Sequence, residues 1–167
     1  MYLLILFGIL IICFGFVVMR GAPYVPSHRR QLERAFSELY PLTAQDVVVD
    51  LGSGDGVVLH EVAHRGARAI GYELNPLLAM MTRLRFRRSP YVTVHTRDYL
   101  LLKELPRDCT LVYAFTTSHS IESIGRKLTE WSTGTTLHFI SYGFTLKDKK
   151  PLRSVGPMHL YLFENGQ

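Results

Sequence analysis

The distribution of hydrophobic and polar positions separates an apolar N-terminal segment from a longer part in which short apolar runs alternate with amphipathic stretches. Residues 2–19 carry no charged side chain and consist almost entirely of Leu, Ile, Phe, Val and Gly. As a helix they would be about 27 Å long at roughly 1.5 Å per residue, close to the hydrocarbon core of a bilayer at about 30 Å. No basic n-region or small-residue cleavage site is evident, so the pattern favours an uncleaved transmembrane helix over a secretory signal peptide.

Positive charge follows this segment directly, at Arg20, Arg29, Arg30 and Arg34. By the positive-inside rule, the rest of the chain is expected on the cytoplasmic side of the membrane, as in a single-pass membrane protein. The segment lacks the Arg- and Ser-rich composition of an organellar presequence. This favours a prokaryotic plasma membrane, with the mitochondrial inner membrane as the alternative location.

Three regions are expected along the chain: a transmembrane anchor at 1–20, a linker with an N-terminal helix at 21–40, and a folded domain at 41–167. The proline-rich residues 21–27 predict a stiff connector. Apolar positions at helical spacing over 29–39 predict a helix with one buried face. The remaining residues are enough for one domain with its own hydrophobic core.

The domain alternates predicted strands and helices. Apolar runs predict strands at 47–49, 67–73, 91–95, 109–115, 135–141 and 158–163, and helical spacing predicts helices at 56–65, 75–88 and 118–131. The unbroken run Val47, Val48 and Val49 is typical of a central parallel strand that is buried on both faces. This order predicts a doubly wound, Rossmann-like, mostly parallel α/β sheet with its ligand at the carboxyl ends of the first strands.

A glycine-rich turn follows the first of these strands, with the sequence DLGSGDG at residues 50–56. Glycine tolerates positive φ there and lets the backbone approach a ligand closely. A dinucleotide fingerprint, G-x-G-x-x-G, would place its third glycine at the position of Val57, so an NAD-dependent oxidoreductase is disfavoured. Asp50 suits a ligand with an ammonium group better than one with a pyrophosphate. The expected ligand-binding residues of this turn are Asp50, Gly52, Ser53, Gly54 and Gly56.

Two further acidic residues follow the second and third predicted strands. Glu73 ends the second strand, where a carboxylate can accept hydrogen bonds from both hydroxyls of a ribose. Asp98 follows the third strand, where it could accept a bond from an adenine amino group, while the backbone N–H of Tyr99 reaches a ring nitrogen. The three strand ends therefore predict one nucleoside-binding site.

The amino-acid composition excludes few classes of binding partner. The net charge is +5 and the sequence pI is about 9.4, while the two cysteines show no metal-ligand spacing. The match of residues 60–64 to H-E-x-x-H is interpreted as chance on a solvent-facing helix, and no metal is expected. Arginines cluster at residues 83–88, which indicates a solvated helix end or contact with anionic lipid. Nucleic acid is not expected, because no aromatic stacking surface accompanies these charges.

Taken together, the turn and the two acids resemble the motifs of class I S-adenosyl-L-methionine (AdoMet) methyltransferases. A narrower resemblance joins the apolar N-terminal segment with GAPYVPS at 21–27, DLGSGDG at 50–56 and GYELNP at 71–76. In this respect the chain is similar to the membrane-anchored adenine nucleotide translocase and ATP synthase c-subunit lysine methyltransferases. Against a full class I sheet, the C-terminal third is expected to be abbreviated.

The resemblance implies a membrane-anchored, AdoMet-dependent protein-lysine N-methyltransferase that acts on a membrane-associated protein. Aromatic rings could hold a methylated ammonium by cation–π contact, and the candidates are Tyr24, Tyr113, Phe115 and Tyr142. No dedicated general base is expected. The alternatives are a methyltransferase for a lipid or other small apolar molecule, and a non-catalytic AdoMet-binding module.

Overall fold

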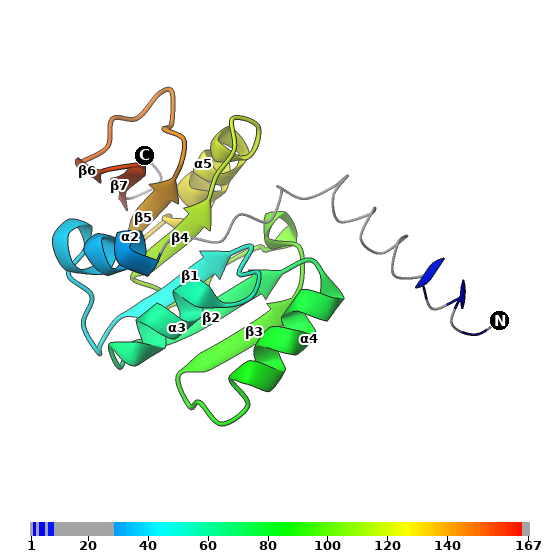
Figure 1. Cartoon of the computed structure of the whole chain (residues 1–167). Helices are drawn as coiled ribbons and strands as arrows, with labels where there is room; N and C mark the ends of the chain where they lie inside the picture. Colours follow the sequence, from blue (N-terminus) through cyan, green and yellow to red (C-terminus); the bar gives the residue numbers. More distant parts are fainter. Residues whose placement is uncertain (1, 3, 6, 9–28, 165–167) are drawn as a thin grey trace.

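The computed structural model describes residues 2, 4, 5, 7, 8 and 29–164 (Figure 1). Most of the predicted transmembrane segment, and all of the connector with Tyr24, lie outside the described residues. Within the described part of the chain, no helix combines the length and the apolar character that crossing a membrane requires.

A seven-stranded sheet forms the centre of the domain, in the order β3-β2-β1-β4-β5-β7-β6 (Figure 1). Strands β1 to β5 run parallel to one another, and β7 runs antiparallel between β5 and β6. The strands are β1 (Val47–Leu51), β2 (Arg68–Glu73), β3 (Val92–Thr96), β4 (Leu111–Phe115), β5 (Thr136–Tyr142), β6 (Arg153–Val155) and β7 (Met158–Glu164). The predicted Rossmann-like, mostly parallel α/β sheet is confirmed.

Helices cover both faces of this sheet (Figure 1). Helix α2 (Arg29–Arg34) continues into the π-helical turn η1 (Ala35–Leu39), and both pack on one face together with α3 (Val57–His64) and α4 (Pro76–Arg85). Helix α5 (Ser120–Trp131) packs on the other face, next to the short 3-10 helix η2 (Tyr99–Leu101). The protein is thus a three-layer α/β domain in which every central strand is covered on both sides.

Strand β1 lies in the middle of the sheet, as its β-branched sequence predicts. It pairs with β2 on one side and β4 on the other, and all five of its residues are buried. Val47 and Val49 face the α5 side, whereas Val48 faces α3. The side chain of Asp50, next in the alternation, therefore faces the side of α3 and η1.

The C-terminal part differs from the expectation of an abbreviated sheet with one last strand. Two strands follow β5, because β6 forms an antiparallel hairpin with β7 in which Arg153 pairs with Leu160 and Val155 pairs with Met158. Strand β6 has only three residues, none of them buried, so it leaves no apolar run in the sequence. The strands of the sheet are therefore complete, and residues 143–152, between β5 and β6, form a loop instead of a helix.

Candidate active site

The glycine-rich turn bends sharply away from the end of β1 and is held against β2. Gly52, Gly54 and Gly56 have φ values of 86°, 52° and 78°, a region that side chains with a Cβ rarely adopt. The backbone N–H groups of Gly52 and Ser53 donate to the carbonyl oxygen of Tyr72 at 2.8 and 3.1 Å. A Cβ on Gly52 would meet no atom within 4 Å, so the outer side of the turn is open for a ligand to approach the backbone.

Helix α4 supports the same turn from outside. The hydroxyl of Thr82 donates to the carbonyl oxygen of Gly54 at 2.8 Å, and the Nη1 of Arg85 donates to that of Asp55 at 3.1 Å. A Cβ on Gly56 would lie only 2.7 Å from Thr82 Cγ2 and 2.8 Å from Phe86 Cε2, so the turn and α4 are in direct contact. Sequence reasoning missed these positioning residues, although a hydroxyl after the apolar residues 77–81 was a usable signal.

The carboxylate of Asp50 is buried beside two other acidic residues, and its side chain is only 2% exposed. Burial, and then the negative charges of Glu73 and Asp55, raise the pKa of Asp50 well above its usual value. An ammonium group is the ligand that would stabilise the ionised form of such a carboxyl. The structure therefore provides an acidic site for a cationic group at the end of β1.

Glu73 joins the turn to the start of α4. Its buried carboxylate accepts hydrogen bonds from the N–H of Gly54 at 2.8 Å through Oε2, and from the N–H of Asn75 at 2.7 Å through Oε1. Asn75 caps α4 by accepting from the N–H of Leu77 at 2.9 Å. Each oxygen of Glu73 keeps further acceptor capacity, which is what two neighbouring ribose hydroxyls require.

Asp98 and Tyr99 lie just after β3, on the same edge of the sheet. Asp98 is half-buried and caps η2, with its Oδ1 accepting from the N–H of Leu100 at 2.9 Å. Tyr99 packs against the core on the α5 side. Burial, and then the charges of Asp98 and Glu73, raise the pKa of Tyr99. Because β1, β2 and β3 are neighbours, the residues predicted for the nucleoside lie on one edge, and their individual roles stay predictions.

The side chain of Ser53 is not placed for contact with a ligand on the open side of the turn. Its hydroxyl is buried and has no hydrogen-bond partner among the described residues. A Cβ on Gly71 of β2 would lie 2.5 Å from this Oγ, so the side chain sits between the turn and β2. Any contact of Ser53 with a ligand on the open side of the turn would then come from its backbone.

We expect Gly71→Ala to displace the turn. The added methyl would lie 2.5 Å from Ser53 Oγ and 2.8 Å from Leu59 Cδ1. Overpacking of this kind costs about 1–3 kcal/mol, which should lower Tm by about 3–10 °C. Thermal unfolding measures the change, and adding Ser53→Gly should restore part of it in a double-mutant cycle. An unchanged Tm in Gly71→Ala would contradict this packing.

The four aromatic candidates have different positions. Tyr24 lies outside the described residues. Tyr113 is 1% exposed and packs on Phe36 with ring centroids 6.3 Å apart, so its burial in the core does not favour contact with a substrate. Phe115 and Tyr142 end β4 and β5, are half-buried, and stack with centroids 5.2 Å apart. Their side chains lie on the same face of the sheet as the side chain of Asp50. Because Asp50 pairs with Tyr113, Phe115 and Tyr142 are two residues nearer the carboxyl edge of the sheet than Asp50.

The H-E-x-x-H match lies on α3, and one part of its interpretation was wrong. Glu61 is buried rather than solvent-facing, and its Oε1 accepts from Nη2 of Arg65 at 2.9 Å. His60 and His64 stack with ring centroids 6.2 Å apart. In the part of the chain that the structure describes, no group of three or more His, Cys, Asp or Glu residues could hold a metal ion.

Comparisons with known proteins point to methyltransferases. No family model matches the chain. It is 42% identical over 78 residues to the ATP synthase c-subunit lysine N-methyltransferase of Xenopus laevis, covering 47% of this chain and 33% of the relative. It is 36% identical over 139 residues to the adenine nucleotide translocase lysine N-methyltransferase of Mus musculus, covering 80% and 58%. A ribosomal RNA small subunit methyltransferase A of Thermotoga petrophila is 37% identical over 91 residues, covering 54% and 34%.

This chain therefore spans between about a third and three fifths of the length of these relatives. Among solved structures, an RNA methyltransferase from Salinibacter ruber in complex with S-adenosyl-L-homocysteine superimposes with a TM-score of 0.69 at 25% identity. That alignment covers 83% of this chain and 92% of the other. The 23S rRNA methyltransferase ErmE matches in fold with a TM-score of 0.60, covering 71% of this chain and 48% of that one.

These findings agree with the predicted cofactor, AdoMet, and with the predicted resemblance. RNA methyltransferases among the relatives were not predicted from the sequence. Their presence means that the comparisons do not support the prediction that nucleic acid is not a partner. By fold the chain resembles AdoMet-dependent methyltransferases, and by sequence it resembles methyltransferases that include the lysine N-methyltransferases of the adenine nucleotide translocase and the ATP synthase c-subunit.

Proposed function

We propose that this protein binds AdoMet at the carboxyl edge of β1, β2 and β3 and catalyses transfer of its methyl group. The observation that carries the proposal is the acidic group formed by Asp50, Glu73 and Asp55 around an open glycine turn. AdoMet supplies two positive charges, an ammonium and a sulfonium, and an activated methyl group. Asp50 would receive the ammonium, and Glu73 would receive the ribose hydroxyls. Asp98 and the backbone of Tyr99 would contact the adenine.

The chain's own residues would mainly position the reactants, because an activated methyl group needs an aligned nucleophile more than it needs acid or base catalysis. Phe115 and Tyr142 form a half-buried aromatic stack next to this edge. Aromatic faces attract cations, and an apolar surrounding lowers the pKa of an amine that enters it. Both effects suit a lysine side chain, which must lose a proton before it can accept the methyl group.

We further propose that the acceptor is a lysine of a membrane-associated protein. Two of the three relatives compared by sequence are named as lysine N-methyltransferases. The apolar residues 2–19 would tether the domain at the cytoplasmic face of a membrane, and tethering raises the effective concentration of a membrane substrate. The same tether would serve a methyltransferase that acts on a lipid or other small apolar molecule.

RNA is the second candidate acceptor. A relative named as a ribosomal RNA methyltransferase matches 54% of the chain, against 47% and 80% for the two lysine methyltransferases. The net charge of +5 is compatible with a polyanionic partner. An exocyclic amine of a base could occupy the same place beside Phe115 and Tyr142 as a lysine amine.

A labelling experiment separates these acceptors. Purified full-length protein is incubated with methyl-labelled AdoMet and either membranes or ribosomal RNA from the native organism. An Asp50→Ala, Glu73→Ala double variant serves as the control. We expect label in a membrane protein, at a lysine, that is absent with the double variant. Label in RNA or in the lipid extract would replace the proposed acceptor, whereas no AdoMet binding at all would overturn the proposed function.

A further inference from the structure

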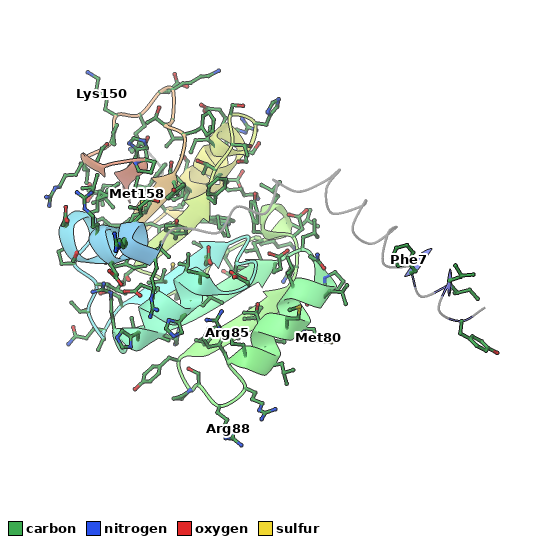
Figure 2. All side chains as sticks on the ribbon, in the orientation of Figure 1. Phe7, Met80, Arg85, Arg88, Lys150 and Met158 are labelled. Atoms are coloured by element: carbon green, nitrogen blue, oxygen red, sulfur yellow. The ribbon has the colours of Figure 1, made fainter. Side chains whose placement is uncertain are left out.

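Helix α4 is oriented opposite to an ordinary surface helix. The residues that it buries are small or polar, Ala79 and Thr82. Leu78 is half-buried, whereas the other large apolar side chains of α4 and the preceding Leu74 face away from the sheet and are between 40% and 63% exposed: Leu74, Leu77, Met80, Met81 and Leu84. Their spacing of three and four residues places them on one side of the helix. Figure 2 labels Met80 on this helix. We call these five residues the outer face of α4.

Arginines lie beside and just beyond the C-terminal end of this outer face. Arg83 is directed toward β3, with its Nε donating to the carbonyl oxygen of Val94 at 2.8 Å and its Nη2 to Thr96 Oγ1 at 2.6 Å. Arg85 is directed to the opposite side, toward Asp55. Arg87 and Arg88 follow the last turn and are exposed, and Arg88 can be located in Figure 2. Residues 74–88 contain four arginines and no acidic residue.

An apolar strip bordered by arginines is the pattern of a helix that lies in the interface of an anionic membrane. The arginines would meet lipid phosphates and the Leu and Met side chains would enter the boundary with the acyl chains. RNA would satisfy the arginines but would leave the apolar strip against sugar and phosphate. A second copy of the chain would cover the strip but would bring the arginines of both copies to one interface, where they repel.

We propose that the outer face of α4 docks onto the surface of an anionic lipid bilayer. This contact is separate from the apolar residues 2–19 and does not depend on the reaction. Helix α4 also holds the glycine-rich turn through Thr82 and Arg85. Docking would therefore place the candidate active site beside the membrane surface and fix the orientation of the domain, which a tether alone leaves free.

Fluorescence quenching by brominated lipids tests the contact in the full-length chain. The chain has a single tryptophan, Trp131, which is buried in the core and donates to the carbonyl oxygen of Leu102. Met81→Trp adds a reporter on the outer face of α4. Leu152→Trp adds a matched control beside β6, at the opposite edge of the sheet, where Leu152 is similarly exposed. Each variant is reconstituted in phosphatidylcholine vesicles with or without phosphatidylglycerol.

In vesicles that contain phosphatidylglycerol, bromination should quench the added emission of Met81→Trp by about half or more and leave Leu152→Trp near the wild-type signal. Arg87→Glu with Arg88→Glu should return Met81→Trp to the level of the control. Equal quenching of the two reporters would overturn the proposal. So would a Met81→Trp signal that responds to added ribosomal RNA or to protein concentration instead of lipid. No AdoMet is needed, so failure here is distinct from failure of the proposed function.

Discussion

Asp50→Asn is expected to weaken AdoMet binding about 100-fold and, in the same protein, to raise the stability of the ligand-free state. The first effect follows because the variant leaves an ammonium without its buried counter-charge. Removing one partner of such a pair costs about 2–5 kcal/mol, and a 100-fold loss corresponds to about 2.7 kcal/mol. Isothermal titration calorimetry on the full-length chain in detergent measures the affinity.

The specificity of this loss can be checked with 5′-methylthioadenosine, which keeps the nucleoside of AdoMet and lacks the amino acid part. Asp50→Asn should leave the affinity for this ligand within about twofold, since no ammonium is involved. An equal loss for both ligands would indicate that the variant damages the turn as a whole. In that case Asp50 would not be the site of the ammonium.

The gain in stability expected for Asp50→Asn increases as pH rises. Burial, Glu73 and Asp55 raise the pKa of Asp50 in the folded protein above its usual 3.8, so the folded state binds this proton more readily than the unfolded state. Stability contributed by the protonated form is therefore lost as pH rises from about 4 through the raised pKa. Above that range Asp50→Asn should raise Tm by about 3 °C or more, and below pH 4 the difference should disappear. Differential scanning calorimetry over this pH range measures it.

The features that could be predicted from the sequence are those set by neighbours along the chain. Val47, Val48 and Val49 suit only a strand buried on both faces, and the three glycines that follow suit only a tight turn. Glu73 ends β2 and Asp98 lies two residues beyond β3, because polar residues stop apolar runs. Because β1, β2 and β3 are parallel neighbours, the segments that follow them lie at the same carboxyl edge of the sheet.

The features that could not be predicted depend on how an element is rotated or paired. Tyr113 is two residues from the end of β4, and only the packing of η1 over this face decides that its ring is enclosed. The rotation of α4 decides that Thr82 and Arg85 reach a turn about thirty residues away. Strand β6 forms because the following strand, β7, pairs with it as an antiparallel hairpin. None of its residues is buried, so its sequence shows no alternation of apolar and polar side chains that would predict a strand.

Asp50 and Glu73 are expected to serve different halves of the same ligand, and Glu73→Ala provides the second strong test. The variant removes the acceptor for the N–H groups of Gly54 and Asn75 and the proposed acceptor for both ribose hydroxyls. A buried N–H that loses its partner costs about 1–3 kcal/mol, and the lost ribose contacts add to this cost. We expect the affinity for AdoMet to fall by about 100-fold or more.

Unlike Asp50→Asn, Glu73→Ala should weaken 5′-methylthioadenosine about as much as AdoMet, because both ligands carry the ribose. It should also lower Tm, whereas Asp50→Asn raises it. Glu104→Ala, which removes an exposed carboxylate from the loop that follows η2, is the matched control and should change neither affinity nor Tm. If Glu73→Ala lowered Tm but bound 5′-methylthioadenosine normally, Glu73 would be a support for the turn and not the ribose acceptor. If Asp50→Asn raised Tm and weakened only AdoMet, while Glu73→Ala lowered Tm and weakened both ligands, Asp50 would be assigned to the ammonium and Glu73 to the ribose of AdoMet.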